Sequence, residues 1–330
     1  MTPSMPSLIS LSDIREAAER IRPIARTTPL VDASGAAGRP FFLKCESLQP
    51  GGAFKIRGAY NMVARLSPEQ RARGVITYSS GNHGQAVALA ARQLGAPAVV
   101  VMPTTAPPIK VEGARSFGAE LIFAGTTSAH RRERAETEAA KRGLTMVPPF
   151  DHEWIIAGQA TAGLEILEQC VDVAAVVVPV GGGGLVSGVA AAVKLTRPNV
   201  KVVGVEPAGA AKMKASVDAG QVVTLPSTAS IADGLMPVRP GDLTFAHVQA
   251  FVDAVVTVED PAIAAAVLWI FANAKIVSEP SGAATTAAVL GGVVDAAVKI
   301  DGPIVAIVSG GNMSLETLQE LEASRSLAPR

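Results

Sequence analysis

The feature that most constrains the fold is a repeated alternation of short β-branched runs with alanine-rich helical runs. Between residues 75 and 142 this pattern predicts three strand and helix pairs in succession. Strands are predicted at Val75–Tyr78, Ala98–Met102 and Glu120–Phe123, and helices at His83–Leu94, 108–117 and Ser128–Arg142. Because strands that alternate with helices favour parallel sheets flanked by helices, the expected fold class is α/β.

The same alternation occurs on both sides of this block. Further strands are predicted at Phe41–Cys45, Ala174–Val180, Lys201–Val205, Ala254–Val258 and Ile304–Val308, and further helices at 54–66, 154–169, 185–195 and from the N-cap residue Asp260 onward. The stretch 206–252 has no clear pattern. Hydrophobic residues make up 48% of the chain and aromatic residues only 4%, so the core is expected to consist of Ala, Val, Ile and Leu.

The length of the chain predicts more than one lobe. A chain of 330 residues exceeds the ~250–300 residues at which single cores stop growing. We expect a larger, cofactor-binding lobe made of residues 1–73 and 151–330, and a smaller lobe made of residues 74–150. The Pro148-Pro149 pair is the expected hinge.

Charge and cysteine content exclude several classes of protein. Lys plus Arg and Asp plus Glu each number 29, so there is no net positive charge to attract nucleic acid, and a small molecule is the expected partner. The two cysteines, Cys45 and Cys170, cannot build a disulfide framework or a C-x-x-C site. Residues 1–12 lack the features of a signal peptide, and no apolar run approaches the ~20 residues of a membrane span, so we expect a cytoplasmic protein without a membrane partner.

One lysine, Lys55, stands in a glycine-flanked loop just before a predicted helix. Three further glycine-rich turns, at 79–84, 181–184 and 309–312, each close an apolar run and open a helical one. In open α/β sheets ligands gather beyond the carboxyl ends of the strands, where all four turns are expected. We therefore predict that Lys55 is the chemical centre of an enzyme and not a solvated charge at a helix start.

The tetraglycine turn Gly181–Gly184 is suited to phosphate. Its backbone N–H groups carry no Cβ obstruction and precede a helix whose positive end attracts anions. A dinucleotide fold is the competing interpretation, because Glu206 ends the next strand at about the place where an acid binds an adenine ribose. The G-x-G-x-x-G spacing fails at Ser187, however. A purely structural role for the glycines also remains open.

The turn Tyr78–Gln85 is rich in hydroxyl and amide groups and is suited to a carboxylate. Its candidate substrate-binding residues are Ser79, Ser80, Gly81, Asn82 and His83. Helix capping by Ser79 and core packing by His83 are the structural alternatives. One anion site for phosphate and another for carboxylate together suggest a phosphorylated cofactor and an amino-acid substrate.

Six motifs, in the same order, resemble the threonine/serine dehydratase and serine racemase family of fold-type II pyridoxal phosphate enzymes, and the resemblance extends from about residue 10 to 320. They are Phe54–Ala59, Ser79–Gln85, Gly181–Gly184, Gly204–Pro207, Glu279–Gly282 and Ser309–Asn312. The resemblance implies a two-lobed fold like that of the tryptophan synthase β subunit, with parallel sheets flanked by helices. It also implies pyridoxal 5'-phosphate as cofactor and a homodimer.

The resemblance further implies a role for each matching residue. Lys55 forms a Schiff base with the cofactor and later removes the α-proton of the substrate. The other cofactor-binding residues are Phe54 beside the ring, Asn82 at the ring hydroxyl, Gly181, Gly182, Gly183 and Gly184 around the phosphate, Glu279, and Ser309 facing the pyridine nitrogen. The implied reaction is the loss of water from a 3-hydroxy amino acid such as threonine or serine, which gives a 2-oxo acid and ammonia.

Departures from the family pattern leave the substrate open. Ser80 matches the second base of serine racemase, so racemisation is an alternative to dehydration, and Ser80 is a candidate catalytic residue beside Lys55. Residues 235–238 replace polar pocket residues with mostly apolar ones, which favours a larger side chain such as that of phenylserine. Arg131 or Arg239 would instead pair with the second carboxylate of 3-hydroxyaspartate.

A metal site is also in doubt. Relatives often hold a divalent cation through acids that match Glu206 and a position six residues later, and Glu206 and Ala210 are the candidate ligands here. The later position is Lys212 in this chain. Its ammonium either replaces the cation, whether divalent or monovalent, or points to water.

Two other classes of protein stay open. A nicotinamide-dependent oxidoreductase would be colourless and bind NAD. A two-lobed sensor that has lost the chemistry is the alternative that is not an enzyme, and the presence of both Lys55 and Ser309 argues against it.

Overall fold

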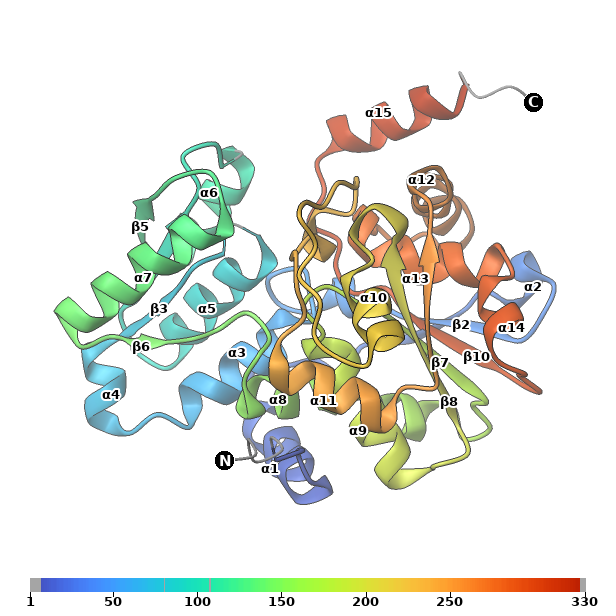
Figure 1. Cartoon of the computed structure of the whole chain (residues 1–330), viewed down its shortest axis with the longest axis horizontal. Coiled ribbons are helices and arrows are strands. Elements are labelled where there is room, and N and C mark those ends of the chain that lie inside the picture. The colour runs from blue at the N-terminus through green and yellow to red at the C-terminus, as the bar shows by residue number, and fades with distance from the viewer. Residues whose placement is uncertain (1–6, 80, 107, 327–330) are drawn as a thin grey trace.

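Two sheets organise the chain in the computed structural model, which describes residues 7–79, 81–106 and 108–326. The larger sheet has six strands in the order β1-β2-β10-β7-β8-β9, and the smaller has four in the order β5-β4-β3-β6. Neighbouring strands are parallel except β1 with β2. In Figure 1 the smaller sheet with its helices lies on the left and the larger on the right.

The strands are short. Those of the larger sheet are β1 (Leu30–Asp32), β2 (Phe41–Lys44), β7 (Ala175–Pro179), β8 (Lys201–Pro207), β9 (Ala254–Val258) and β10 (Ile304–Ile307). Those of the smaller sheet are β3 (Val75–Thr77), β4 (Ala98–Met102), β5 (Glu120–Phe123) and β6 (Thr145–Met146).

Helices connect and cover the strands. The α-helices are α1 (Leu11–Ile21), α2 (Ser34–Ala37), α3 (Lys55–Ala64), α4 (Pro68–Arg73), α5 (Asn82–Gln93), α6 (Pro108–Ser116), α7 (Ser128–Arg142), α8 (Glu153–Gln169), α9 (Gly184–Thr196), α10 (Lys212–Ala219), α11 (Asp242–Phe251), α12 (Asp260–Trp269), α13 (Pro280–Leu290), α14 (Val293–Ala297) and α15 (Leu315–Ser326). Shorter turns are η1 (Glu46–Leu48), η2 (Ala208–Ala210), η3 (Asp233–Leu235) and the π-helical η4 (Ile270–Ala274).

The larger sheet is buried on both faces. Every residue of its central strand β7 is buried, and the run is rich in valine without polar alternation, as expected of a parallel strand covered on two sides. Val177 and Ala306 pack with α12, α13 and α14, whereas Val176 and Ile307 pack with α8, α9 and α11. The result is a three-layer arrangement that confirms the predicted α/β class.

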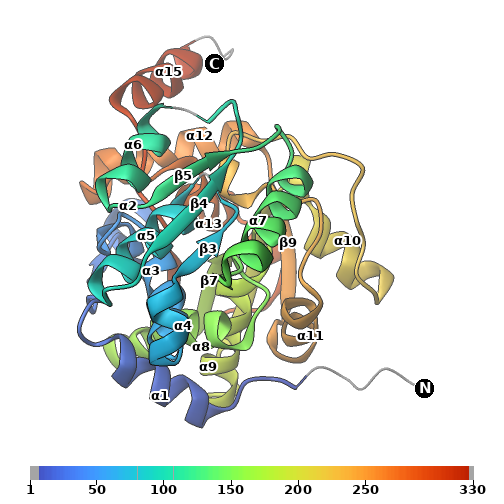
Figure 2. The same ribbon diagram turned by 90° about the vertical axis from the view of Figure 1, so that its left-hand side faces the viewer.

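The smaller sheet is covered in the same way. Val75 and Val100 face α3 and α5, whereas Ile76 and Val99 face α7. Figure 2 shows α7 crossing in front of this sheet. Helix α3 packs against both α5 and α8, so it joins the cores of the two sheets. The lobe boundaries after residues 73 and 150 therefore remain a proposal, which the two separate sheets support.

Most predicted elements are confirmed to within a few residues, and the differences have local causes. Helix α12 begins at Asp260 with Glu259 as its N-cap, so Asp260 is the first helical residue and not the cap. The stretch 206–252, which has no clear pattern in sequence, contains α10 and α11. Among the described residues, none of the helices combines the length and the apolar character that crossing a membrane requires.

Candidate active site

Three of the glycine turns meet at one edge of the larger sheet. Strands β2, β10 and β7 are adjacent and parallel, so their carboxyl ends lie side by side. The loop before Lys55 follows β2, the turn at Ser309 follows β10, and the tetraglycine turn follows β7. The topology therefore gathers these turns where ligands of such sheets bind.

Lys55 is the first residue of α3, and its loop is fastened to the turn after β10. Gly51 and Gly52 have φ angles of 79° and 75°, which favour glycine. A Cβ on Gly52 would also overlap the side chain of Asn312. The backbone N–H of Phe54 donates to the carbonyl of Ser309 at 3.0 Å. These contacts fix the position of Lys55 beside Ser309.

The amine of Lys55 has an unusual environment. Its Nζ donates to the carbonyl of Pro149 at 2.8 Å and lies 5.0 Å from the centre of the Phe54 ring. A hydrogen bond to a carbonyl favours the charged amine, but burial outweighs it and lowers the pKa of Lys55 from 10.5 to about 8. A substantial neutral fraction near neutral pH is what a nucleophile or a base requires.

Arg57, in the first turn of α3, is fully buried and forms two ion pairs that fix this turn. Its Nε donates to Glu46 at 2.7 Å and its Nη1 to Glu165 at 2.6 Å. Glu46, also fully buried, and Glu165 raise the pKa of Arg57 against the opposing effect of burial, so the guanidinium is charged. The role of Arg57 could not be predicted, because a lone arginine two positions after Lys55 gives no sign of its distant partners.

Asn82 belongs to the turn after β3, and hydrogen bonds bring it to the larger sheet. Its Nδ2 donates to Glu279 at 2.6 Å, and its Oδ1 accepts from Asn312 at 2.9 Å. Burial and the charge of Asp233 raise the pKa of Glu279 from 4.5 to about 7. The predicted residues Asn82, Glu279 and Ser309 thus meet around the turn that holds Lys55, and Asn312 is a contact that sequence analysis did not single out.

The tetraglycine turn fits an anion. It leads into α9, its N-cap residue Gly183 has a φ of 103°, and none of the described side chains caps the helix. The N–H groups of the first turn are therefore available to a phosphate. A Cβ on Gly182 would overlap the Phe150 ring, so the absence of a side chain also allows Phe150 to pack closely against this turn. Phosphate binding and structural packing, which sequence reasoning weighed as alternatives, are compatible here.

The second turn is tightly folded. Gly81 is the N-cap of α5 without a side-chain cap, and Ser79 Oγ accepts from its N–H at 3.4 Å. His83 is buried, its Nε2 donates to the carbonyl of Val147 at 3.1 Å, and its Nδ1 has no partner among the described residues. Burial and the charge of Lys55 lower the pKa of His83 to about 3, so the imidazole is neutral. Ser80, a predicted catalytic and substrate residue, lies outside the described residues.

The two predicted substrate arginines are not drawn into these contacts. Arg239 is partly exposed and pairs with Asp242 at 2.8 Å. Arg131 donates to Ser128 at 2.8 Å, and its buried Nε has no partner in the described part of the chain. Neither forms a hydrogen bond to another predicted site residue in that part. Their role in binding a substrate therefore stays a prediction.

Glu206 is not available to a ribose or an exposed metal. It is fully buried, and its two oxygens accept from the backbone N–H groups of Met213 and Lys214 at 2.9 and 2.8 Å. Lys212 is also fully buried and pairs with Glu206 at 2.9 Å. The interpretation that Lys212 points to water is therefore wrong. The dinucleotide alternative loses its acidic ribose partner for the same reason.

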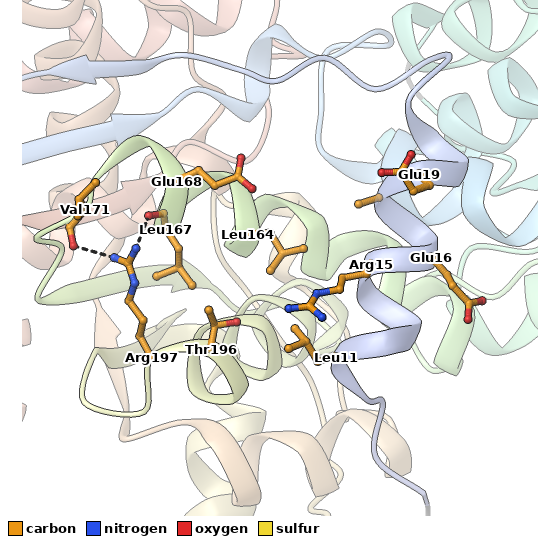
Figure 3. Close-up of a pocket in the computed structure, with 11 residues that line it drawn as sticks. Leu11, Arg15, Glu16, Glu19, Leu164, Leu167, Glu168, Val171, Thr196 and Arg197 are labelled. Atoms are coloured by element: carbon orange, nitrogen blue, oxygen red, sulfur yellow. Dashed lines mark hydrogen bonds between the residues drawn. The ribbon is translucent and has the colours of Figure 1, made fainter.

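The pocket in Figure 3 is a separate feature. It lies between α1, α8 and the end of α9, and no predicted site residue lines it. Its Arg197 donates to the carbonyls of Val171 and Leu167 at 2.7 and 2.9 Å, as Figure 3 shows. These bonds satisfy carbonyl groups at the end of α8, which indicates a structural role.

Comparisons with known proteins agree with this geometry. A family model described as "Pyridoxal-phosphate dependent enzyme" matches residues 21–310. The chain is 43% identical over 318 residues to the L-threonine ammonia-lyase of Thermotoga maritima, covering 95% of this chain and 78% of the relative.

Solved structures are similar over nearly the whole chain. The structure of maize serine racemase superposes with a TM-score of 0.91 at 39% identity, covering 97% of this chain and 98% of that one. The processed form of threonine deaminase isoform 2 from Solanum lycopersicum superposes with a TM-score of 0.90 at 37% identity, covering 98% and 91%. An anion cradle and a partly buried lysine of lowered pKa agree with these matches. The family model and the relatives show that the chain belongs to the pyridoxal-phosphate-dependent enzyme family.

Proposed function

We propose that this protein is a pyridoxal-phosphate-dependent ammonia-lyase of the threonine and serine type. It removes water from a 3-hydroxy amino acid, and the released enamine takes up water to yield a 2-oxo acid and ammonia. The observation that carries the proposal is the partly buried amine of Lys55, whose pKa is lowered to about 8, beside an anion cradle and the side chain of Phe54. The relatives named L-threonine ammonia-lyase and threonine deaminase support this reaction.

The residues present fit the cofactor. The N–H groups at Gly181–Gly184 would hold its phosphate, and Lys55 would hold its aldehyde carbon. Asn82 has two N–H groups, of which Glu279 accepts one, so the other can donate to the ring oxygen. When bound, pyridoxal phosphate supplies an aldehyde that captures the substrate amine and a ring that withdraws electrons from the breaking Cα–H bond.

The chain's own groups then perform proton transfer and orientation. Lys55 Nζ, neutral in part at physiological pH, accepts the α-proton and becomes an ammonium. The N–H groups at the start of α5 are suited to the substrate carboxylate, since no side chain within residues 7–79, 81–106 and 108–326 caps that helix. Ser309 presents a neutral hydroxyl, which does not force protonation of the pyridine nitrogen as an aspartate would.

The proposal is tested by Lys55→Ala, with Lys201→Ala as a control because Lys201 is a partly exposed lysine at the start of β8 that pairs with Asp253. Lys55→Ala should abolish the yellow absorbance of the bound cofactor and the release of 2-oxo acid. Borohydride treatment of the wild type followed by peptide mapping should leave the pyridoxyl label on Lys55. Turnover retained by Lys55→Ala, or a label elsewhere, would refute the proposal.

A panel of threonine, serine, 3-hydroxyaspartate and phenylserine would identify the substrate. In the structure Leu235 is buried and Val238 is 41% exposed, so an apolar pocket for large side chains stays a prediction. We expect threonine and serine to be turned over fastest. A chiral assay for D-serine in the same reactions would detect racemisation.

We also propose a cytoplasmic homodimer. Cys45 and Cys170 are both buried free thiols, which is compatible with a reducing compartment. Light scattering during size-exclusion chromatography should give twice the chain mass of 33.7 kDa. A mass of a single chain would contradict the dimer.

A further inference from the structure

Lys212 begins α10 and places its ammonium inside a cage of oxygen atoms. Nζ lies 3.0 Å from the carbonyl of Val180, 3.1 Å from that of Ala210 and 2.9 Å from that of Leu235. Glu206 Oε1 completes the cage at 2.9 Å. The lysine side chain is fully buried. Three segments distant in sequence therefore converge on one positive charge.

The cage requires a charged amine. An ammonium has three N–H donors for these four acceptors, whereas a neutral amine has two and would direct a lone pair at an oxygen. Glu206 supplies the negative charge that a buried cation needs, although burial itself lowers the pKa of Lys212. The distances suit N–H···O bonds and exceed the ~2.0–2.6 Å at which magnesium and calcium bind oxygen.

The family resemblance implies a metal cation here, and the residues do not fit one. The second acidic ligand is replaced by Lys212, whose Nζ already holds Glu206 and the carbonyl of Ala210, the two predicted ligands. Within residues 7–79, 81–106 and 108–326 no group of three or more His, Cys, Asp or Glu side chains is placed to hold a metal ion. A cation of the protein's own thus stands where a metal would bind.

The cage joins the cofactor turn to a neighbouring loop. Val180 immediately precedes Gly181, and Leu235 immediately follows Gly234. A Cβ on Gly181 would lie 3.0 Å from the carbonyl of Gly234, so the two backbones are packed together. The N–H of Gly234 in turn donates to Ser281 at 2.8 Å. Losing the charge would release both the phosphate turn and the loop at 230–235.

We propose that Lys212 is a built-in cation, which replaces a metal ion and holds the tetraglycine turn against the segment 230–235. Lys212 is a positioning residue, since it acts through the backbone of these two segments. The enzyme then needs no metal for cofactor binding or turnover. Its Tm and its turnover should therefore not respond to added Mg²⁺ or Ca²⁺, unlike those of a metal-requiring enzyme of the same fold.

The first test uses the wild-type holoenzyme. After exhaustive dialysis against EDTA it should contain far less than one metal ion per chain, and its Tm, turnover and cofactor content should be unchanged. Added Mg²⁺ or Ca²⁺ should not raise the Tm. A stoichiometric metal ion, or a Tm that rises with either cation, would overturn the proposal.

The second test changes the charge. Lys212→Met keeps the length of the side chain but removes the donors, and it should raise the Kd for pyridoxal phosphate by tenfold or more, with no rescue by metal. Lys212→Asp should create a cation site with Glu206, so Mg²⁺ or Ca²⁺ should raise its Tm. Lys201→Met is the control and should match the wild type.

Two results would overturn the proposal that Lys212 replaces a metal ion. One is a Lys212→Met variant that binds cofactor as tightly as Lys201→Met. The other is a Lys212→Asp variant whose Tm ignores both cations. If neither Lys212 variant folds, the metal content and the cation response of the wild type decide the matter alone.

Discussion

The lowered pKa of Lys55 has a measurable consequence for the reactivity of the cofactor-free protein. A change from 10.5 to about 8 raises the neutral fraction of the amine at pH 7 by ~300-fold, to about a tenth. Lys55 should therefore react with an acylating reagent with a midpoint near pH 8. The hydrogen bond to Pro149 does not prevent this, because burial disfavours the charge more strongly than one carbonyl favours it.

Competitive acetylation with peptide mass spectrometry measures that midpoint directly. The control is the same Lys55 peptide in protein unfolded by urea, where the ordinary value near 10.5 should return. Stability gives a second measurement. Between pH 8 and 10.5 the unfolded chain binds more protons at Lys55 than the folded chain does, so folding becomes more favourable as pH rises through this window.

The size of the stability effect follows from the same shift. The penalty for burying the amine is fully present below pH 8 and amounts to about 3 kcal/mol. Lys55→Met should remove it, so the stability gap between this variant and the wild-type apoenzyme should narrow from pH 8 to 10.5. A folded Lys55 that titrates like the unfolded peptide, or a gap independent of pH, would refute the reasoning.

Two further predictions concern the surroundings of Lys55. Gly182→Ala places a Cβ in the Phe150 ring, and the overpacking of ~1–3 kcal/mol should weaken cofactor binding by about 5- to 160-fold. Gly35→Ala, whose Cβ meets nothing within 4 Å, should leave cofactor binding unchanged. Equal Kd values for the two variants in a fluorescence titration would contradict this. For Glu279, whose pKa is raised from 4.5 to about 7, the folded chain binds more protons between these values, so stability falls as pH rises from 4.5 to 7. In urea unfolding, the free energy of unfolding of Glu279→Gln relative to that of the wild-type apoenzyme should rise by up to about 3 kcal/mol between pH 4.5 and 7. A difference that stays constant over this pH range would contradict the raised pKa of Glu279.

Much of the fold follows from local pattern. The buried strands and their helices are predictable because valine-rich runs, glycine turns and alanine-rich helices alternate along the chain. Helices α10 and α11 escape detection for identifiable reasons. The first residue of α10 is the buried Lys212, which does not look apolar, and α11 is capped by Asp151, whose carboxylate accepts from Asp242, Leu243 and Thr244. No residue near α11 in sequence reveals that cap.

The candidate site is likewise only partly predictable from local sequence. Lys55, Asn82 and the four glycines are predictable because each lies in a turn whose composition indicates its chemistry. The contacts that orient them involve residues distant in sequence. Asn312 donates a hydrogen bond to Asn82, 230 positions away, and the Phe150 ring packs against Gly182. Such partners follow from tertiary packing, which a single sequence does not specify locally.

The segment Pro149–Asp151 connects the smaller sheet to the site around Lys55. It leaves the smaller sheet just after Val147, whose N–H donates to Ile76 at 2.8 Å. Within a few residues it contacts the amine of Lys55, the tetraglycine turn and the start of α11. A displacement of this segment would therefore move all three contacts together. We expect a compound bound at this crossover to inhibit the enzyme without occupying the site of the cofactor or of the amino acid.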